Sequence, residues 1–365
     1  MDYFDKWRFE FVLTGGPCAG KTTALSVLEQ ALTARGYKVM IVPETATELI
    51  NSGITPWELT QNVFQDMVLS RSFHKEEMVS RAAWRSAEHS NKNVVIFYDR
   101  GIMDGKAYTE HTAFKEMLHE YGYTETEARD RYDAIFHLVT AADGAEESYT
   151  LANNKARTET PEQARAADLR TRNAWVGHPH LRVIDNSTPF KEKIDRLIKE
   201  VFSVMGLPVP IEIERKYLIE KPHLSMLEFN EGVVKTSILQ TYLKTTTPGV
   251  ERRVRQRGDG SSFSYYYTEK ITLSDLSRQE TERKITVQEY LAFLLEGEKK
   301  IRKDRYCFIY GNQYFELDIY PDWGNEAILE IELTEETQEV DIPNWIRVIR
   351  EVTDDPNYKN VNLAK

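Results

Sequence analysis

The first 204 residues alternate apolar runs with long stretches of helical periodicity. Five runs rich in Val, Ile, Leu and Phe predict strands at 9–16, 37–44, 93–100, 134–141 and 181–187. The remaining periodic stretches predict helices at 21–34, 58–90, 106–120, 161–176 and 189–204. Four of the five runs are apolar enough to be buried on both faces, as the strands of a parallel sheet are. The alternation therefore predicts an α/β fold with a parallel sheet.

The rest of the chain has a different pattern, in which strand-like runs follow one another with few helices. These runs are 211–219, 235–244, 250–257, 263–272, 279–286, 305–310, 313–320 and 327–334. Such a succession predicts an antiparallel β structure with helical insertions, closed or nearly closed. Gly206, Pro208 and Pro210 interrupt the chain between the two patterns. We therefore predict two domains, 1–206 and 211–365.

The composition narrows the class of protein. The 365 residues are 41% hydrophobic and 29% charged, which is typical of a soluble globular protein. A net charge of −11 argues against a general nucleic-acid surface but permits a local basic cavity. No apolar run approaches the roughly 20 residues that span a bilayer, and the first residues lack a secretory layout. With two cysteines, Cys18 and Cys307, we expect no disulfide scaffold and a cytoplasmic location. The oligomeric state stays open.

The segment GGPCAGKT, residues 15–22, fits the pattern G-x-x-x-x-G-K-[ST] between a predicted strand and a predicted helix. In that setting, glycines let backbone N–H groups surround phosphates at the helix N-terminus. Lys21 would reach the β and γ phosphates, and Thr22 would be a ligand of Mg²⁺. The sequence therefore predicts a site for ATP or GTP. Its residues are Gly15, Gly16, Pro17, Cys18, Ala19, Gly20, Lys21, Thr22 and Thr23.

Two further strand ends point to the same edge of the predicted sheet, where open α/β sheets bind ligands. Asp99 and Arg100 follow an apolar run, so Asp99 is a candidate carboxylate for Mg²⁺ or its water. Glu44 ends another run and has two interpretations. It is either a base or metal-linked carboxylate facing a phosphoryl acceptor, or a helix N-terminal charge.

Arg165, Arg170 and Arg172 lie on the predicted helix before the last strand of the first half. In nucleotide and nucleoside kinases, a mobile lid at this place supplies arginines to the transferred phosphate. A solvated charged helix is the alternative, and the sequence does not separate the two.

Charges alternate with other residues in many strands of the second half. In EIERKY (212–217), Glu212, Glu214 and Lys216 share one face, because side chains alternate faces in a strand. The same spacing recurs in RVRQR, RQETE, KDR, ELD and EIE. If the strands close, these faces form one polar lumen, in which Lys and Arg hold a polyphosphate and carboxylates hold Mg²⁺ or Mn²⁺. The alternative is that each strand shows its charged side to water.

The first half resembles the P-loop kinases, on TGGPCAGKTT and VPETAT, especially the small ATPase-like proteins related to nicotinamide riboside and deoxynucleoside kinases. The second half resembles the CYTH, or triphosphate tunnel metalloenzyme, superfamily. The motifs that carry this resemblance are EIERK, QTYL, RVRQR, KDRY, ELDIY, ILEIEL and EVTDDPNYKNVNLA. Together they resemble fused P-loop/CYTH proteins.

The CYTH resemblance implies an eight-stranded antiparallel tunnel with catalytic residues on its inner face. The metal-linked residues would be Glu212, Glu214, Glu282, Asp318, Glu330 and Glu332, with Glu280 beside them. The phosphate-binding residues would be Lys216, Arg253, Arg255, Lys270, Lys303 and Arg305.

Three functions follow from these resemblances. The first is Mg²⁺- or Mn²⁺-dependent hydrolysis of an inorganic, nucleoside or thiamine triphosphate in the tunnel. The second is an ATP- or GTP-regulated binding module that recognises a phosphoinositide or another phosphorylated partner. The third is a nucleoside or nucleotide kinase that uses the P-loop and Glu44.

Overall fold

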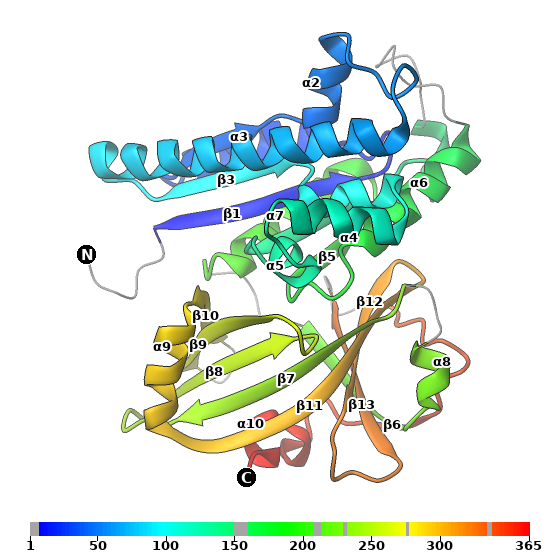
Figure 1. Cartoon of the computed structure of the whole chain (residues 1–365). Helices are drawn as coiled ribbons and strands as arrows, with labels where there is room; N and C mark the ends of the chain where they lie inside the picture. Colours follow the sequence, from blue (N-terminus) through cyan, green and yellow to red (C-terminus); the bar gives the residue numbers. More distant parts are fainter. Residues whose placement is uncertain (1–6, 149–159, 208–212, 229–231, 275–276, 334–337) are drawn as a thin grey trace. The chain divides into compact units, whose positions relative to one another are not determined.

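The computed structural model describes residues 7–148, 160–207, 213–228, 232–274, 277–333 and 338–365 (Figure 1). The chain divides into two compact units, Met1–Ile198 (unit 1) and Lys199–Lys365 (unit 2). This division falls within helix α7 (Phe190–Val204), before the predicted boundary. Residues 208–212 lie outside the described residues, so the limits 206 and 211 stay a prediction.

Unit 1 is built on a parallel five-stranded sheet in the order β2-β3-β1-β4-β5. The strands are β1 (Arg8–Gly15), β2 (Lys38–Val42), β3 (Val94–Asp99), β4 (Ala134–Leu138) and β5 (Leu181–Ile184). All five predicted strands and their parallel arrangement are confirmed. Phe11 of β1 is fully buried and contacts Phe97 of β3 and Phe136 of β4. Burial on both faces explains why these runs are so apolar.

Helices connect these strands, and the long α3 runs along the sheet (Figure 1). The helices are α1 (Lys21–Thr33), α2 (Thr45–Asn51), α3 (Gln61–Ser90), η1 (Ile102–Tyr108), α4 (His111–Glu120), α5 (Glu125–Arg129), η2 (Glu146–Ser148), α6 (Pro161–Ala174) and α7. The predicted helix 106–120 is two elements, η1 and α4, because the backbone is extended at Thr109 and Glu110. The short α2 and α5 were not predicted, since so few residues show little periodicity. Thr160 caps α6 by accepting a hydrogen bond from Gln163 N–H.

Unit 2 is built on a nine-stranded antiparallel sheet in the order β10-β9-β8-β7-β11-β12-β13-β6-β14. The strands are β6 (Ile213–Glu220), β7 (Val234–Leu243), β8 (Val250–Gly258), β9 (Phe263–Ser274), β10 (Ser277–Ile285), β11 (Gly297–Tyr310), β12 (Gln313–Ile319), β13 (Glu326–Leu333) and β14 (Val348–Glu351). The short helices are α8 (Leu224–Glu228), α9 (Val287–Phe293), η3 (Leu294–Glu296), η4 (Pro356–Tyr358) and α10 (Asn360–Leu363). The antiparallel fold and its eight predicted strands are confirmed. The ninth, β14, adds a short strand beside β6.

The two faces of this sheet differ in character. One face carries an apolar cluster that includes Tyr217, Phe315 and Leu329, with Trp345 packed against it. Residues of the other parity carry the alternating charges found in the sequence, and they lie on the opposite face. Figure 1 shows the sheet curving strongly, with β7 to β10 on one side and β12, β13 and β6 on the other.

The C-terminal residues pack at one end of the charged face. Tyr242, Ile301 and Ile328 form a cluster with Ala364, and Val361 packs against it. Lys300 and Lys365 exchange backbone hydrogen bonds of 2.7 and 3.0 Å. Apolar side chains of the segment that contains α10 therefore cover this end of the face.

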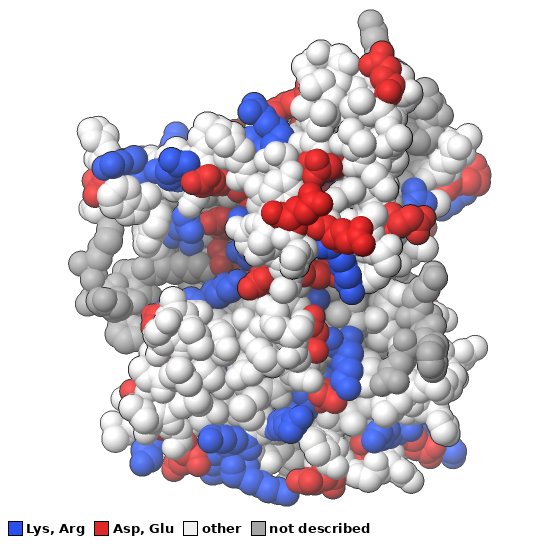
Figure 2. Space-filling view, viewed as in Figure 1, with Lys and Arg blue, Asp and Glu red and all other residues white. Residues whose placement is uncertain are grey.

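The distribution of charge on the surface and the polarity of the helices fit the overall composition. On the face shown in Figure 2, basic and acidic side chains are interspersed and form no large field of one sign. Among the helices of the described ranges, none has both the length and the apolar character needed to cross a membrane.

Candidate functional site

The segment Gly15–Thr22 joins the end of β1 to the start of α1 in a conformation that requires glycine. Gly15 and Gly20 have φ angles of 147° and 88°, and Cys18 also has a positive φ, of 58°. A Cβ atom on Gly15 would lie 2.1 Å from the carbonyl oxygen of Leu138, and one on Gly20 would lie 2.5 Å from the Phe190 ring. The predicted P-loop residues thus form one tight turn at the N-terminus of a helix.

Lys21 and Asp99 face each other at the end of the sheet. Lys21 Nζ lies 3.8 Å from Asp99 Oδ1. Burial lowers the pKa of Lys21, and the positive charge of Arg100 adds to that effect. Burial raises the pKa of Asp99, against the influence of Lys21. Asp99 Oδ1 is buried and has no hydrogen-bond partner among the described residues. An oxygen of this kind suits a hard cation such as Mg²⁺, so the donor chemistry of Thr22 and Asp99 fits the predicted metal.

Glu44 and Arg100 form an ion pair beside this lysine. Arg100 Nε donates to Glu44 Oε1 at 2.6 Å, and its Nη1 lies 3.3 Å from Asp104 Oδ1. Glu44 also occupies the N-cap position of α2, although it caps no backbone N–H with its side chain. Burial would raise the pKa of Glu44, but Arg100 and Lys21 lower it to about 2. The side chain is therefore a fixed anion at this edge of the sheet.

Asp104 and Asp168 belong to this region and were not predicted as site residues. Asp104 in η1 is buried and accepts hydrogen bonds from the Thr14 hydroxyl and from Gly101 N–H. Asp168 in α6 is buried and accepts a 2.7 Å hydrogen bond from Gly16 N–H in the P-loop. Each follows an ordinary helical pattern, so the only signal was a carboxylate on an otherwise buried helix face.

The three arginines of α6 have different surroundings. Arg165 Nη1 donates to the carbonyl oxygen of Ala142 at 2.7 Å, and Arg170 Nε to that of Ala107 at 3.1 Å. Arg172 is buried, and this burial lowers its pKa. These contacts attach α6 to neighbouring segments of unit 1. A role of these arginines as a lid over a transferred phosphate stays a prediction.

In unit 2, a first group of charged side chains, the Arg305 cluster, joins β6, β11, β12 and β13. Arg305 donates to Asp318 at 2.7 and 2.6 Å, to Glu330 at 2.7 Å, and to Glu316. Lys303 donates to Asp318. Lys216 Nζ lies 2.9 Å from Glu330 and 3.1 Å from Glu214. The cluster comprises Glu214, Lys216, Lys303, Arg305, Glu316, Asp318 and Glu330.

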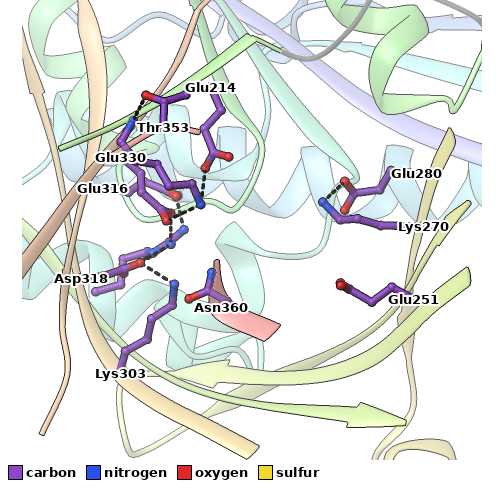
Figure 3. A network of polar contacts seen from close by, with 12 residues as sticks. Glu214, Glu251, Lys270, Glu280, Lys303, Glu316, Asp318, Glu330, Thr353 and Asn360 are labelled. Carbon is purple, nitrogen blue, oxygen red and sulfur yellow. Dashed lines mark hydrogen bonds and ion pairs between the residues drawn. The ribbon is translucent and has the colours of Figure 1, made fainter. Parts of the chain in front are cut away.

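A second group, the Arg255 cluster, joins β8, β9 and β10. Arg255 Nη2 donates to both carboxylate oxygens of Glu282, at 2.9 and 3.0 Å. Glu280 lies 2.5 Å from Lys270 and 3.3 Å from Arg253. The cluster comprises Arg253, Arg255, Lys270, Glu280 and Glu282. Figure 3 shows Lys270 and Glu280 pointing toward the residues of the Arg305 cluster, so the charged face is the inner face of the curved sheet.

Burial and ion pairing set the protonation states on this face. Burial opposes charging of Lys216, but Glu330 and Glu214 raise its pKa. Burial likewise opposes ionisation of Glu330, while Lys216, Lys303 and Arg305 hold its pKa well below the usual range. Lys303 has a lowered pKa because it is buried and lies close to Arg305. The face is therefore a network of paired charges.

The structure brings together most of the predicted tunnel residues. Glu332 is exposed, Glu212 lies outside the described residues, and Glu316 is an additional member. The two-residue spacing from Asp318 was the signal for Glu316. Among the described residues, no three acidic, His or Cys side chains are arranged to hold a metal. Asp318 is paired with Lys303 and Arg305, and Glu330 with Lys216 and Arg305. Carboxylate oxygens are ligands that Mg²⁺ accepts, and the tunnel metal stays a prediction.

Several known proteins are similar to this chain. An inorganic triphosphatase of Acetivibrio thermocellus is 38% identical over 104 residues, which are 27% of this chain and 65% of that protein. The chain thus spans less than two thirds of this relative. The crystal structure of the inorganic triphosphatase NE1496 is 31% identical over 43% of this chain and 95% of its own, with a TM-score of 0.31. The PH1819 protein of Pyrococcus horikoshii OT3 is 17% identical over 35% of this chain and 80% of its own, with a TM-score of 0.28.

Residues 10–193 match a protein family described as AAA domain. The match includes the P-loop, Glu44, Asp99 and Asp168. Because it extends over slightly more than half of the 365 residues, the protein belongs to the AAA-domain family.

Proposed function

We propose that unit 2 binds a triphosphate on its inner charged face and hydrolyses one of its phosphoanhydride bonds. The observation that carries this proposal is the convergence of six cations from four strands on one face. They are Lys216, Arg253, Arg255, Lys270, Lys303 and Arg305. Guanidinium and ammonium groups arranged in this way suit a chain of phosphate oxygens. Similarity to an inorganic triphosphatase supports the same chemistry.

Carboxylates balance these cations in the described structure. Six of them pair with the six cations: Glu214, Glu280, Glu282, Glu316, Asp318 and Glu330. A bare triphosphate would add several negative charges to a face on which these cations are already paired with carboxylates, at a large electrostatic cost. Bound Mg²⁺ or Mn²⁺ would neutralise part of that charge. We therefore propose that the triphosphate binds together with a divalent cation. Its phosphate oxygens would then replace the carboxylates as partners of the arginines.

The residues of this chain would bind and orient the phosphate groups. Lys303 of the Arg305 cluster lies across the curve of the sheet from Lys270 of the Arg255 cluster (Figure 3). The two clusters would therefore hold the phosphate chain from both sides. Their positive charges would stabilise the negative charge that shifts to the leaving oxygen when water attacks phosphorus. The inorganic, nucleoside and thiamine triphosphates share this phosphate chain, and we propose the class without choosing among them.

We propose that unit 1 binds ATP or GTP at the P-loop. Lys21 would contact the β and γ phosphates, while Thr22 and Asp99 would hold Mg²⁺. Glu44 is anionic and paired with Arg100, so it would position groups at the site better than it would accept a proton at neutral pH. Kinase activity through Glu44 stays a prediction.

We also propose that the chain is related to a particular group of two-domain proteins. The order of the two halves and the VPETAT segment resemble fused P-loop/CYTH proteins that include the fly TRPL translocation defect protein. That kinship would favour a binding module for a phosphoinositide or another phosphorylated partner.

Phosphate release from tripolyphosphate, ATP, GTP and thiamine triphosphate tests the proposal. The full chain is assayed with Mg²⁺, Mn²⁺ or a chelator, beside the variants Arg255→Ala in unit 2 and Lys21→Ala in unit 1. We expect Arg255→Ala to abolish hydrolysis of tripolyphosphate and Lys21→Ala to retain it. The reverse result would assign hydrolysis to the P-loop. Tight tripolyphosphate binding without turnover would favour the binding module.

A further inference from the structure

Unit 1 contains a cavity of about 590 Å³ that is separate from the P-loop. It is lined by residues from α3, from the start of β1 and from the segments around α5, including Glu10, Glu76, Tyr121 and Arg131. Glu10 precedes Gly15 by five residues on β1, which corresponds to roughly 17 Å along an extended strand. The triphosphate and nucleotide functions proposed above leave this cavity without a role.

Two carboxylates lie in the inner wall, and each is held by a tyrosine and an arginine. Glu76 accepts a 2.6 Å hydrogen bond from the Tyr132 hydroxyl and lies 3.1 Å from Arg131. Glu10 accepts a 2.9 Å hydrogen bond from the Tyr98 hydroxyl and lies 2.8 Å from Arg8. Burial raises the pKa of both acids, and that of Glu76 reaches about 7. Buried acids perturbed in this way and facing a cavity are typical of binding sites.

Another part of the cavity lining is aromatic. The rings of Phe73 and Tyr123 stack with centroids 4.8 Å apart, and Tyr121 lies 5.3 Å from Phe73. The guanidinium of Arg131 lies 5.1 Å from the Phe73 and Tyr123 rings, so its place is fixed. These aromatic side chains are partly exposed, which leaves apolar surface inside a hollow. An apolar group of a ligand would remove that surface from water.

The charged residues that line the cavity indicate which charges a ligand should carry. Three glutamates and three arginines line the cavity, and the third pair, Glu77 and Arg81, is exposed at its rim. A ligand with one net charge would find as many repelling as attracting groups. A ligand with both charges can place each one against the opposite group, and each contact is then a charge-assisted hydrogen bond.

We propose that this cavity binds a small zwitterion of the α-amino-acid type with an apolar or aromatic side chain. Its ammonium group would lie toward Glu76 and Glu10, and its carboxylate toward Arg131 and Arg8. Its side chain would pack against Phe73, Tyr121 and Tyr123.

Titration calorimetry of the full chain with four related probes tests this assignment. The probes are L-phenylalanine, 2-phenylethylamine, 3-phenylpropionate and 2-phenylethanol, which differ in the charges that they carry. We expect L-phenylalanine to bind at least about tenfold more tightly than each of the others. Equal or tighter binding of a probe with one charge or none overturns the assignment. Absence of binding by L-phenylalanine up to about 10 mM overturns it as well.

Variants identify the residues that bind. Glu76→Gln is expected to weaken L-phenylalanine about tenfold and to leave 3-phenylpropionate unchanged, because only the ammonium contact is lost. Glu88→Gln, an exposed residue on the same helix, is the matched control. Lys21→Ala should leave L-phenylalanine binding intact, which separates the cavity from the nucleotide site. Equal loss in Glu76→Gln and Glu88→Gln, or loss in Lys21→Ala, contradicts the proposal.

The wild-type chain offers a test that needs no variant. Glu76 interacts with Arg131 and Tyr132 from the segment before β4, with Glu10 of β1 and with Tyr98 of β3. The other titratable residues of the lining are Arg8, His74, Glu77, Arg81, Tyr121 and Tyr123. An ammonium group binds the ionised form of Glu76, so affinity for L-phenylalanine should rise about tenfold from pH 6 to pH 8. A flat or falling profile would exclude Glu76 as the ammonium partner. If Glu76→Gln does not fold, Tyr121→Leu provides a second variant. Tyr121 is half-buried in the cavity lining, and its replacement should weaken the binding of L-phenylalanine.

Discussion

Asp168 of α6 accepts a 2.7 Å hydrogen bond from the backbone N–H of Gly16 in the P-loop. The same oxygen accepts a 3.0 Å hydrogen bond from Thr140 N–H, after β4, and the other oxygen lies 3.1 Å from His137 Nε2. Asp168, Thr140 and His137 are all buried. A Cβ atom on Gly16 would lie 2.7 Å from Asp168, so only glycine fits there. One carboxylate thus fixes the P-loop, the end of β4 and α6 together.

The substitution Asp168→Asn should weaken nucleotide binding by unit 1 about tenfold and lower its melting temperature. The amide oxygen of Asn could still accept from Gly16 and Thr140, but its NH₂ group would replace the oxygen that faces His137. The negative charge that strengthens the hydrogen bonds from the two N–H groups would also be lost. Nucleotide titration and thermal unfolding of the full chain measure the two effects. Asp195→Asn, at an exposed position on α7, is the matched control. Unchanged nucleotide affinity in Asp168→Asn would show that the P-loop holds its shape without this carboxylate.

Lys21→Ala should reduce nucleotide affinity by at least about tenfold and leave unit 1 folded. The Lys21 side chain is only 10% exposed and has Arg100 nearby, and both effects lower its pKa and disfavour its charged form in the absence of a ligand. We therefore expect Lys21 to contribute more to the binding of an anion than to the folding stability of unit 1. Nucleotide titration with the exposed Lys38→Ala as control checks this. Wild-type affinity in Lys21→Ala would remove Lys21 from the phosphate site.

The sequence predicted the parallel sheet well because its strands are short, apolar and bounded by long helices. The strand predicted to begin at residue 305 begins earlier, because β11 starts at Gly297. Its first residues, GEKK, are charged and lack the apolar alternation by which a strand is recognised. The sequence predicted the tunnel residues through their two-residue spacing, since a strand fixes which side chains share a face. Asp104 and Asp168 were missed because their contacts join segments that are far apart in the chain. Only the fold brings those segments together.

Glu76 should make unit 1 less stable as the pH rises from about 4.5 to 7. Its folded pKa is raised from 4.5 to about 7, so the folded state binds the proton more strongly than the unfolded state. Stability from this group is full below the unfolded pKa and is lost as the pH rises through the folded pKa. The difference in unfolding free energy between wild type and Glu76→Gln should therefore change by up to about 3 kcal/mol between pH 5 and pH 8. Denaturant unfolding at the two pH values measures it. A constant difference would mean that Glu76 does not titrate in this range.

Arg305→Lys tests whether the geometry of the Arg305 cluster matters beyond its charge. The guanidinium contacts Asp318 through two nitrogens and also reaches Glu330 and Glu316. A lysine keeps the positive charge but cannot make these contacts together, because its single nitrogen has no planar fork.

We expect Arg305→Lys to lower the unfolding free energy of unit 2 by about 1–3 kcal/mol, since buried carboxylates lose donors. Hydrolysis of tripolyphosphate should fall by at least about tenfold, because a phosphate chain needs the same fork of donors as the carboxylates do. Arg302→Lys is the control, on the same strand but at an exposed position of the other face. Assays are run at a temperature at which both variants are fully folded, so lost activity reports the site. If Arg305→Lys is folded and hydrolyses tripolyphosphate at the wild-type rate, its positive charge alone suffices, and the phosphate chain must be oriented by the Arg255 cluster.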